Sequence, residues 1–305
     1  MLLALVGPTA SGKTEAAMAI AGTLGAEIVS VDSMLVYRGM DVGTAKPTAE
    51  QRARVPHHLI DLVEPSEAFS VARYQALGRA ALADIGRRGS LPILSGGSGL
   101  YFRALVDELD FPGTDAATRA ELQLEVSAVG ATGMHRRLAL TDPAAAAKIE
   151  PSNVRRTVRA LEVAAITGRE FSSFAASWER YPPGHVRAAG IEVPRDVLVA
   201  RIEARVRAMV EGGLLGEVQG LRARGLGGWL TSTQAIGYAE MTAHLEGRRT
   251  LEDAVTETVT RTKALARRQM AWFRRDPRIR WFTAGREGAI GRVDDLLEHL
   301  EGGWS

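Results

Sequence analysis

Three features of the sequence predict an α/β fold. In this fold helices flank a parallel sheet, and an all-helical segment is inserted. Short apolar runs alternate with helical patterns in the amino-terminal part, which is typical of parallel strands joined by crossover helices. A glycine-rich turn joins the first apolar run to the first helical pattern. Between residues 114 and 183 the apolar runs give way to alanine-rich, charged stretches.

The amino-terminal elements are predicted from apolar periodicity. We expect strands over residues 2–6, 27–31, 57–61 and 91–95, and helices over residues 15–24 and 69–86. Glycine-rich or polar segments follow the ends of several of these strands, and in a parallel sheet such segments surround the ligand site.

The remaining elements divide into an insertion and a second part of the sheet. Helices are expected over residues 116–129, 134–140 and 153–167, then a strand over 189–193, helices over 196–211, 214–224, 232–246 and 251–275, a strand over 279–282 and a helix over 293–300. The predicted α/β core therefore comprises residues 1–113 and 184–305, and residues 114–183 form a helical insertion domain. A length of 305 residues suits about two domains.

Composition excludes several classes of protein. The sequence has no cysteine, which removes disulfides, thiolate catalysis and cysteine-based metal sites. Since no apolar stretch is long enough to span a bilayer and no basic leader precedes the first strand, we expect a cytoplasmic protein. Only four of the 38 basic residues are lysine, and arginines cluster at 155–159 and 261–280. Clustered arginine is typical of nucleic-acid surfaces, although the base composition of a genome can produce the same bias.

Residues 7–14 form a complete phosphate-binding loop of the type G-x-x-x-x-G-K-[ST]. It consists of Gly7, Pro8, Thr9, Ala10, Ser11, Gly12, Lys13 and Thr14. The expected strand before it and helix after it are the context that makes this motif specific. Backbone N–H groups and the helix N-terminus attract an anion, Lys13 would reach a terminal phosphate, and the Thr14 hydroxyl would ligate Mg²⁺. We expect the hydroxyls of Thr9 and Ser11 to join the same phosphate site.

Asp32 follows the second expected strand and is a candidate catalytic carboxylate. Because strand ends gather at one edge of a parallel sheet, Asp32, the phosphate loop and the Gly96–Gly99 turn should surround one site. The carboxylate could act as a general base or organise Mg²⁺, and a turn cap is the alternative.

Six motifs in this order resemble the bacterial tRNA dimethylallyltransferases, also called tRNA isopentenyltransferases. They are GPTASGKT at residue 7, DSMLVYRGMDVGTAKP at 32, VPHHLIDLVEP at 55, GGSGLY at 96, QAIGYAE at 234 and RTKALARRQMAWFRR at 261. The resemblance extends over residues 2–282, and the second and fourth motifs are nearly specific to the family.

The resemblance implies a P-loop NTPase-like fold and a prenyl transfer. The dimethylallyl group of dimethylallyl diphosphate would move to N6 of adenosine 37, beside the tRNA anticodon, and Mg²⁺ would assist. Breaking the allylic C–O bond builds charge on the diphosphate, which Lys13 and the loop amides can stabilise. Asp32 matches the family's base for the N6 proton, and the adenine must flip out to reach it. A monomer without an obligate protein partner is implied.

The resemblance also assigns residues to the acceptor tRNA and its anticodon stem-loop. These are Asp32, Ser33, Met34, Leu35, Ser98, Arg119, Arg155, Arg156, Thr157, Val158 and Arg159. Ser98, also a candidate catalytic residue, stands where the family usually has Thr, and Leu35 stands where it usually has Gln. Arg201 is favoured over Arg205 as the arginine near the diphosphate. Arg268, in a basic stripe with Trp272, is expected to bind RNA.

Alternatives remain open from the residues alone. The arginines could form solvated helix faces. A small-molecule kinase, an adenylate isopentenyltransferase or a non-catalytic RNA-binding module would each explain part of the pattern. The strand at 91–95 ends without the acidic residue by which P-loop hydrolases hold Mg²⁺, which favours a transferase. Since adjacent strand residues point in opposite directions, His57 and His58 are not expected to share a metal, and one of them should pack in the core.

Overall fold

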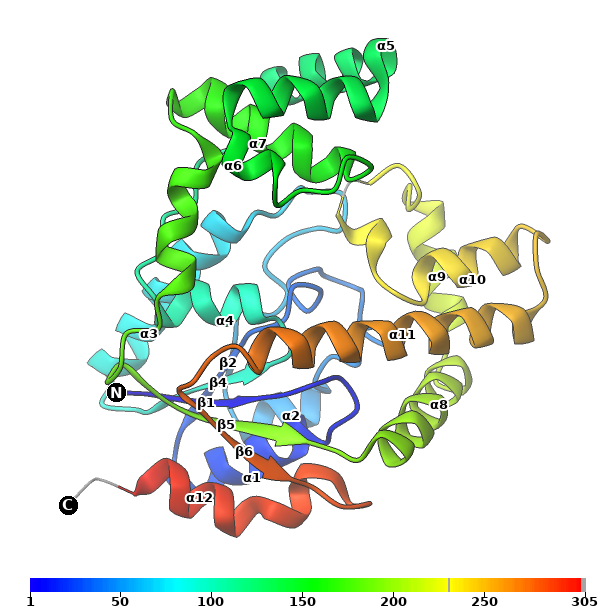
Figure 1. Cartoon of the computed structure of the whole chain (residues 1–305). Coiled ribbons are helices and arrows are strands. Elements are labelled where there is room, and N and C mark those ends of the chain that lie inside the picture. The colour runs from blue at the N-terminus through cyan, green and yellow to red at the C-terminus, as the bar shows by residue number, and fades with distance from the viewer. Residues whose placement is uncertain (230, 303–305) are drawn as a thin grey trace. The chain divides into compact units, whose positions relative to one another are not determined.

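The computed structural model describes residues 1–229 and 231–302 (Figure 1). They divide into two compact units, one of residues 1–106 with 182–302 and one of residues 107–181. The first unit contains the sheet, and the second is helical. Each unit is described separately below.

The larger unit is built on a six-stranded parallel sheet. Its strands are β1 (Leu2–Val6), β2 (Glu27–Ser30), β3 (His57–His58), β4 (Pro92–Gly96), β5 (Val186–Glu192) and β6 (Ile279–Thr283). The spatial order is β3-β2-β4-β1-β5-β6, so β1 lies between β4 and β5. In the register Val6 pairs with Gly96 on one side and with Gly190 on the other. The α/β fold with a parallel sheet and flanking helices is therefore confirmed.

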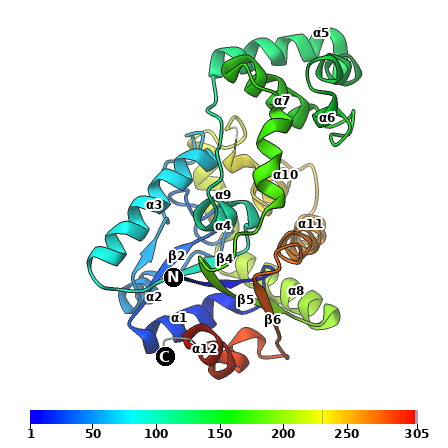
Figure 2. The same ribbon diagram turned by 60° about the vertical axis from the view of Figure 1, so that its left-hand side comes forward.

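Helices lie on both faces of this sheet. The helices of this unit are α1 (Lys13–Leu24), α2 (Ala49–Arg54), α3 (Val71–Arg87), α4 (Gly99–Val106), α8 (Arg195–Glu211), α9 (Leu214–Ala223), α10 (Tyr238–Leu245), α11 (Leu251–Phe273) and α12 (Val293–Glu301), with short 3₁₀ turns η2 (Ser232–Gln234) and η3 (Gly288–Arg292). Of these, α9 and α10 pack on other helices. Helices α1 and α12 lie below the sheet in Figure 1, and α4 and α11 lie above it. Figure 2 shows α3 on the same side of the sheet as α4.

Apolar packing fixes both layers. Leu3, Leu5 and Ile93 of the central strands are buried against Ile20 of α1 and Leu296 of α12. Burying a side chain of this size contributes roughly 1.5–3 kcal/mol. On the opposite face, Tyr74 of α3 stacks on Tyr101 of α4, and Phe102 meets Phe273 of α11 edge to face. The long helix α11 is thereby held across the carboxyl ends of the strands.

The smaller unit consists of α5 (Ala116–Thr141), α6 (Pro143–Ala146), α7 (Val154–Thr167) and the 3₁₀ turn η1 (Phe171–Glu179). Its own core includes Leu122, Met134, Leu138 and Leu161. Gly130, with φ 71° and ψ 176°, interrupts α5, so the element consists of two helical stretches that meet at a kink. The sequence expectation of separate helices over 116–129 and 134–140 reflects this interruption.

Three expectations about individual elements are corrected. The strand expected over 57–61 ends at His58, since Leu59 and Asp61 adopt positive φ. The helix expected over 232–246 is a 3₁₀ turn followed by α10, because Gly237 at φ 98° separates them. Helix α11 ends at Phe273 instead of residue 275.

Candidate active site

A cavity of about 760 Å³ opens in the larger unit beyond the carboxyl ends of the strands. Thr9, Lys13 and Thr14 of the phosphate loop line it, together with Asp32, which follows β2. Ser33, Met34, Leu35 and Ser98 line it as well. The fold therefore brings together the loop, the carboxylate and the turn after β4, which are far apart in the sequence.

The conformation of the phosphate loop depends on residues with positive φ and on the close approach of neighbouring backbone. Gly12 precedes α1 with φ 82°, and a Cβ there would lie 2.9 Å from the Ala289 nitrogen, so glycine is needed. Ala10 also has a positive φ of 62°, which is uncommon for alanine. The Ser11 side chain is fully buried, its hydroxyl has no hydrogen-bond partner among the described residues, and it is not part of the cavity lining, so its contact with a phosphate stays a prediction. The threonines at 9 and 14 do face the cavity.

Lys13 is the cation of the loop. Its Nζ donates to the Pro8 carbonyl oxygen at 2.9 Å. Burial and the nearby Arg205 guanidinium lower the pKa of Lys13 to about 8, against the opposing attraction of the Asp32 and Glu15 carboxylates. A bound anion would favour the charged form of Lys13.

Arg205 of α8 lines the cavity, and Arg201 does not. Arg201 donates from Nε to the Ala10 oxygen at 2.7 Å and from Nη1 to the Arg286 oxygen at 3.0 Å. It thus ties the phosphate loop to the segment before η3. Burial lowers the pKa of Arg205, while Asp32 acts in the opposite direction. Of the two arginines, Arg205, which lies one helical turn further on, is therefore the one on the cavity wall, while Arg201 contacts the backbone of the phosphate loop.

Asp32 and the turn after β4 are positioned by short backbone contacts. The Asp32 Oδ1 accepts a hydrogen bond from the Met34 amide at 2.8 Å, which orients the carboxylate. The Ser98 amide donates to the Val31 oxygen at 3.0 Å, and the Ser98 Oγ faces the Tyr101 amide at the start of α4. A side chain at Gly96 would overlap the Val31 carbonyl, so glycine permits this approach.

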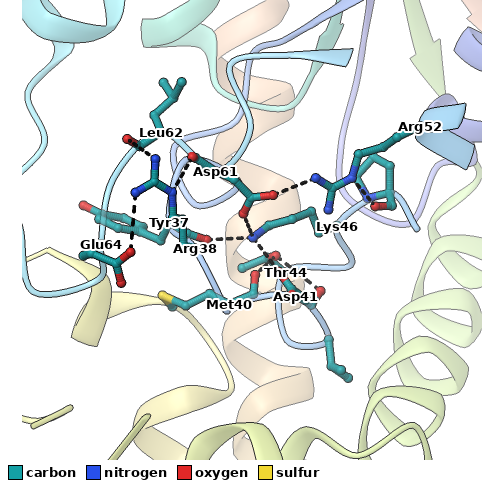
Figure 3. Close-up of polar contacts among 12 residues, drawn as sticks. Tyr37, Arg38, Met40, Asp41, Thr44, Lys46, Arg52, Asp61, Leu62 and Glu64 are labelled. Carbon is teal, nitrogen blue, oxygen red and sulfur yellow. Dashed lines mark hydrogen bonds and ion pairs between the residues drawn. The ribbon is translucent and has the colours of Figure 1, made fainter. Parts of the chain in front are cut away.

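The loop after Asp32 is fixed from inside by Lys46 (Figure 3). This ammonium is almost fully buried and donates to the Tyr37 oxygen at 2.7 Å, to Asp41 Oδ1 at 2.5 Å and to Asp61 Oδ1 at 2.6 Å. Arg52 binds the other oxygen of Asp61 at 2.6 Å. Burial alone would raise the pKa of Asp61, but the hydrogen bonds from Lys46 and Arg52 lower it. A buried charge satisfied in this way rigidifies the loop that carries part of the cavity wall.

The same loop is fixed from outside by Glu217 of α9. Its carboxylate accepts hydrogen bonds from the amides of Asp41, Val42 and Gly43 at 2.7, 2.7 and 3.1 Å. The buried Tyr238 of α10 donates its hydroxyl to the same group at 2.6 Å. Gly43 lies so close to the Tyr238 ring that a Cβ would be 2.6 Å from it. Sequence reasoning missed Glu217, although Tyr238 belongs to one of the six motifs.

Helix α11 forms a further wall of the cavity, with a basic and aromatic surface. Arg261, Arg268 and Trp272 line the cavity. Arg261 forms an ion pair with Glu240, which is buried. Val255, Val259, Ala266 and Phe273 on the same helix are buried. Arg275 lies beyond the end of the helix, which stops at Phe273.

In the helical unit, two of the arginines expected to contact RNA, Arg119 and Arg159, bind a buried acid. Glu162 has no exposed surface and accepts from Arg119 at 2.7 Å, from Arg159 at 2.8 Å and from the Asp115 amide at 3.0 Å. Arg159 also donates to the carbonyl oxygens of residues 112 and 113. Arg155 and Arg156 are exposed.

Two residues of the same segment differ from the expectation. The side chains of Thr157 and Val158 are buried within the helical unit, so they offer no surface to an RNA. Val158 packs in the core of that unit. The amphipathic period of α7 explains this, since a run of consecutive helical residues cannot lie on one face.

The adjacent residues His57 and His58 contact different partners. His58 pairs with Glu27 at 2.6 Å, and His57 contacts the Val55 oxygen at 2.7 Å. Both histidines are half-buried, so the expectation that one of them packs in the core is wrong. Among the described residues, no group of three His, Cys, Asp or Glu side chains could hold a metal ion. Thr14 and Asp32 nevertheless share the cavity, and these oxygen donors fit Mg²⁺, which commonly takes one or two protein ligands with phosphate and water.

No helix within 1–229 and 231–302 has the length and apolarity of a membrane span.

The parallel strand order and the glycine loop between β1 and α1 make this a phosphate-loop α/β protein. β4, which adjoins β1, ends at Gly96 without an acidic residue, so the usual magnesium ligand of phosphate-loop hydrolases is absent from that strand. The carboxylate in front of the loop follows β2 instead. The class so defined is a group-transferring enzyme for a phosphorylated donor.

The chain belongs to the IPP transferase family, whose model matches residues 35–276. A second model, isopentenyl transferase, matches residues 1–63. The chain is 48% identical to the tRNA dimethylallyltransferase of Kineococcus radiotolerans, over 93% of this chain and 90% of that protein. It is 49% identical to that of Anaeromyxobacter dehalogenans, over 92% and 94%.

A solved structure supports the same relationship. The tRNA isopentenylpyrophosphate transferase of Bacillus halodurans is 41% identical, with a TM-score of 0.71 over 98% of this chain and 96% of that one. A eukaryotic dimethylallyltransferase acting on tRNA shares the fold at 24% identity, with a TM-score of 0.77 over 96% of this chain. The family suggested by the six motifs is thus confirmed.

Proposed function

We propose that this chain transfers the dimethylallyl group of dimethylallyl diphosphate to N6 of adenosine 37 in tRNA, giving N6-isopentenyladenosine and diphosphate. Membership of the family makes the chain a prenyltransferase that modifies tRNA. The identity of the donor, the acceptor position and the residue roles belong to the proposal. One observation carries it: Lys13 and Asp32 line the same cavity.

The phosphate loop is the proposed site of the donor diphosphate. As the allylic C–O bond breaks, negative charge builds on the departing diphosphate. Lys13 and Arg205, which line the cavity, and the amides at the start of α1 would stabilise this charge. A Mg²⁺ ion held through the Thr14 hydroxyl would add positive charge when bound.

Asp32 is the proposed acceptor of the N6 proton. The adenine nitrogen forms a C–N bond to the allylic carbon, the C–O bond breaks, and the N6 proton passes to the carboxylate. The Met34 amide holds that carboxylate in place. Ser98 and the backbone around Leu35 would contact the flipped adenosine, with Leu35 offering an apolar surface.

Basic residues on both units are the proposed contacts to the rest of the tRNA. Arg268 on α11 lines the cavity, and Arg155 and Arg156 are exposed on α7. Residues 114–183 would act as the tRNA-contacting insertion. As the family resemblance implies, the proposal includes action as a monomer, and the tRNA acceptor implies the cytoplasm as its place.

A labelling assay tests the proposal. Purified protein is incubated with Mg²⁺, labelled dimethylallyl diphosphate and either unmodified tRNA or AMP. Label in tRNA alone is expected; label in AMP would indicate an adenylate isopentenyltransferase, and ATP hydrolysis without label transfer a kinase or ATPase. Asp32→Ala should abolish transfer and leave tRNA binding intact. Normal turnover of this variant at saturating tRNA would contradict the proposed base.

A further inference from the structure

One carboxylate, that of Glu217 on α9, collects four hydrogen bonds. It accepts from the backbone amides of Asp41, Val42 and Gly43 at 2.7, 2.7 and 3.1 Å. The Tyr238 hydroxyl donates to it at 2.6 Å. Successive amides that point at one anion form a concave backbone site, and hydrogen bonds to a charged acceptor are about twice as strong as those between neutral groups. Glu217 is not one of the described residues that line the cavity, so it can act on a substrate only through the groups that it holds.

The amides that Glu217 holds belong to a turn that forms one wall of the cavity, since residues 43–45 line it. Ala45 has a φ of 50°, in the left-handed region, which is unfavourable for a residue with a Cβ. A backbone conformation of this kind persists only where the surrounding structure fixes it. Glu217 binds the turn from outside, and the buried Lys46 binds it from inside through Asp41 Oδ1 at 2.5 Å. Removal of Glu217 should therefore let the turn relax.

A second wall of the cavity is tied to the same carboxylate through Tyr238. Residues 235–237, which directly precede this tyrosine, line the cavity. The tyrosine is buried, and its ring lies so close to Gly43 that a Cβ there would be 2.6 Å away. The Tyr238 hydroxyl and the Gly43 amide donate to the same oxygen, Oε1 of Glu217. This carboxylate therefore fixes the turn of residues 43–45 against residues 235–237.

The chemistry of these two walls indicates which substrate group they face. Residues 43–45 are Gly, Thr and Ala, and residues 235–237 are Ala, Ile and Gly, so neither wall carries a charged side chain. Lys13 and Arg205, the cations proposed for the diphosphate, come from the phosphate loop and from α8 instead. Residues 33–35, which precede the turn in the same segment, include the proposed contacts of the acceptor nucleoside. The two walls therefore suit an uncharged base better than a diphosphate.

We propose that Glu217 is a positioning residue for the acceptor base of the tRNA. It holds the turn of residues 43–45 at a fixed separation from residues 235–237, so that the extruded adenine meets a preformed pocket. This inference rests on the proposed function, in which the cavity takes an adenine out of the anticodon loop. A turn that is free to relax would hold the base less well, whereas contacts to the RNA backbone would be unaffected.

Binding of two anticodon stem-loop RNAs, measured without a donor, tests this. One RNA carries adenosine at position 37 and the other an abasic site there, so the ratio of their affinities reports contacts to the base. The cost of extruding the nucleotide is a property of the RNA pair and is the same for every variant. Glu217→Ala should lower this ratio about ten-fold, the scale of contacts to one base, and leave the affinity for the abasic RNA unchanged. The slope of log K against log salt should not change, because no phosphate contact is lost.

Three further variants sharpen the measurement. Glu217→Gln keeps one acceptor oxygen and should give an intermediate ratio, and it repeats the test if the alanine variant does not fold. Tyr238→Phe removes one of the four hydrogen bonds and leaves the ring over Gly43, so a smaller fall in the ratio is expected. Gln219→Ala, a change of an exposed residue of α9 outside the cavity lining, is the matched control and should leave the ratio unchanged.

The inference is overturned if Glu217→Ala leaves the ratio unchanged, or if it weakens the binding of both RNAs equally, which would indicate a general loss of structure. Weaker binding of dimethylallyl diphosphate by this variant, measured by calorimetry, together with an unchanged RNA ratio would assign the turn to the donor and would also overturn it. The RNA measurements need neither donor nor turnover, so they are independent of the labelling assay. Transfer of label to tRNA together with an unchanged ratio would reject the role of Glu217 alone.

Discussion

The Nη2 of Arg119 lies 2.7 Å from Oε2 of Glu162, a carboxylate with no exposed surface. Arg159 binds the same oxygen at 2.8 Å. Two arginines that were expected to contact RNA are therefore oriented by one buried acid. Removing the acid would leave the Arg119 guanidinium without this partner, whereas Arg159 would keep its hydrogen bonds to the carbonyl oxygens of residues 112 and 113.

Glu162→Ala should destabilise the protein by about 3 kcal/mol, the usual cost of removing one partner of a buried ion pair. Burial raises the pKa of Glu162, but the hydrogen bonds from Arg119 and Arg159 outweigh it and lower the pKa below 4.5. The stabilisation is therefore complete above pH 4.5 and is lost as the pH falls toward the folded pKa. Urea unfolding between pH 7 and pH 3 measures both effects, and a variant as stable as wild type at pH 7 would show that the cluster contributes nothing.

Lys13 gives a second pH dependence, with the opposite sign. Its pKa of about 8 means that the free enzyme loses the loop cation as the pH rises through 8, so kcat/KM for the donor should fall there. Bound diphosphate favours the charged lysine, so the corresponding fall in kcat should lie at higher pH. Lys13→Arg, which stays charged, should remove the alkaline fall even if its rate is lower. Persistence of the same fall in this variant would assign it to another group.

Substitution of Arg205 should mainly lower activity, and substitution of Arg201 should mainly lower stability. Arg205→Ala removes a cation from the cavity wall and should lower kcat by about 10²–10³-fold with little change in melting temperature. Arg201→Ala removes two hydrogen bonds to backbone carbonyls and should cost about 1–3 kcal/mol of stability. Steady-state rates and thermal melts of the two variants provide the comparison. The reverse pattern would restore Arg201 as the diphosphate ligand.

The choice between these two arginines shows where prediction from the sequence ends. Residues 201 and 205 are four apart and share a helix face, so periodicity cannot choose between them. The rotation of α8 against the phosphate loop decides, and it depends on packing by residues distant in the sequence. Sequence patterns predicted the elements that depend on neighbouring residues. The strand, glycine loop and helix of residues 2–24 are confirmed.

The partners of Glu217 and Gln269 illustrate the same limit. Glu217 caps three amides of residues 41–43, and Gln269 caps the amide of Thr9. Gln269 lies in the motif that begins at residue 261 and Glu217 lies in none of the six, but in both cases the amides that they cap are more than 170 residues away in the sequence. Only the packing of α9 and α11 reveals them. The positions of Thr157 and Val158 could have been predicted, since one helical turn cannot expose every residue of a five-residue segment.

Arg268 tests whether the cavity wall on α11 binds RNA backbone. The residue is exposed and lines the cavity beside Trp272. If it neutralises one phosphate, Arg268→Ala should weaken tRNA binding and reduce the slope of log K against log salt by about one unit. Binding measured at several salt concentrations gives the slope. Arg267→Ala removes an equally exposed neighbouring charge outside the cavity lining, so a smaller change is expected there. Equal slopes for wild type and Arg268→Ala would mean that this arginine is a solvated charge, and the RNA contact would then have to come from the rest of the wall.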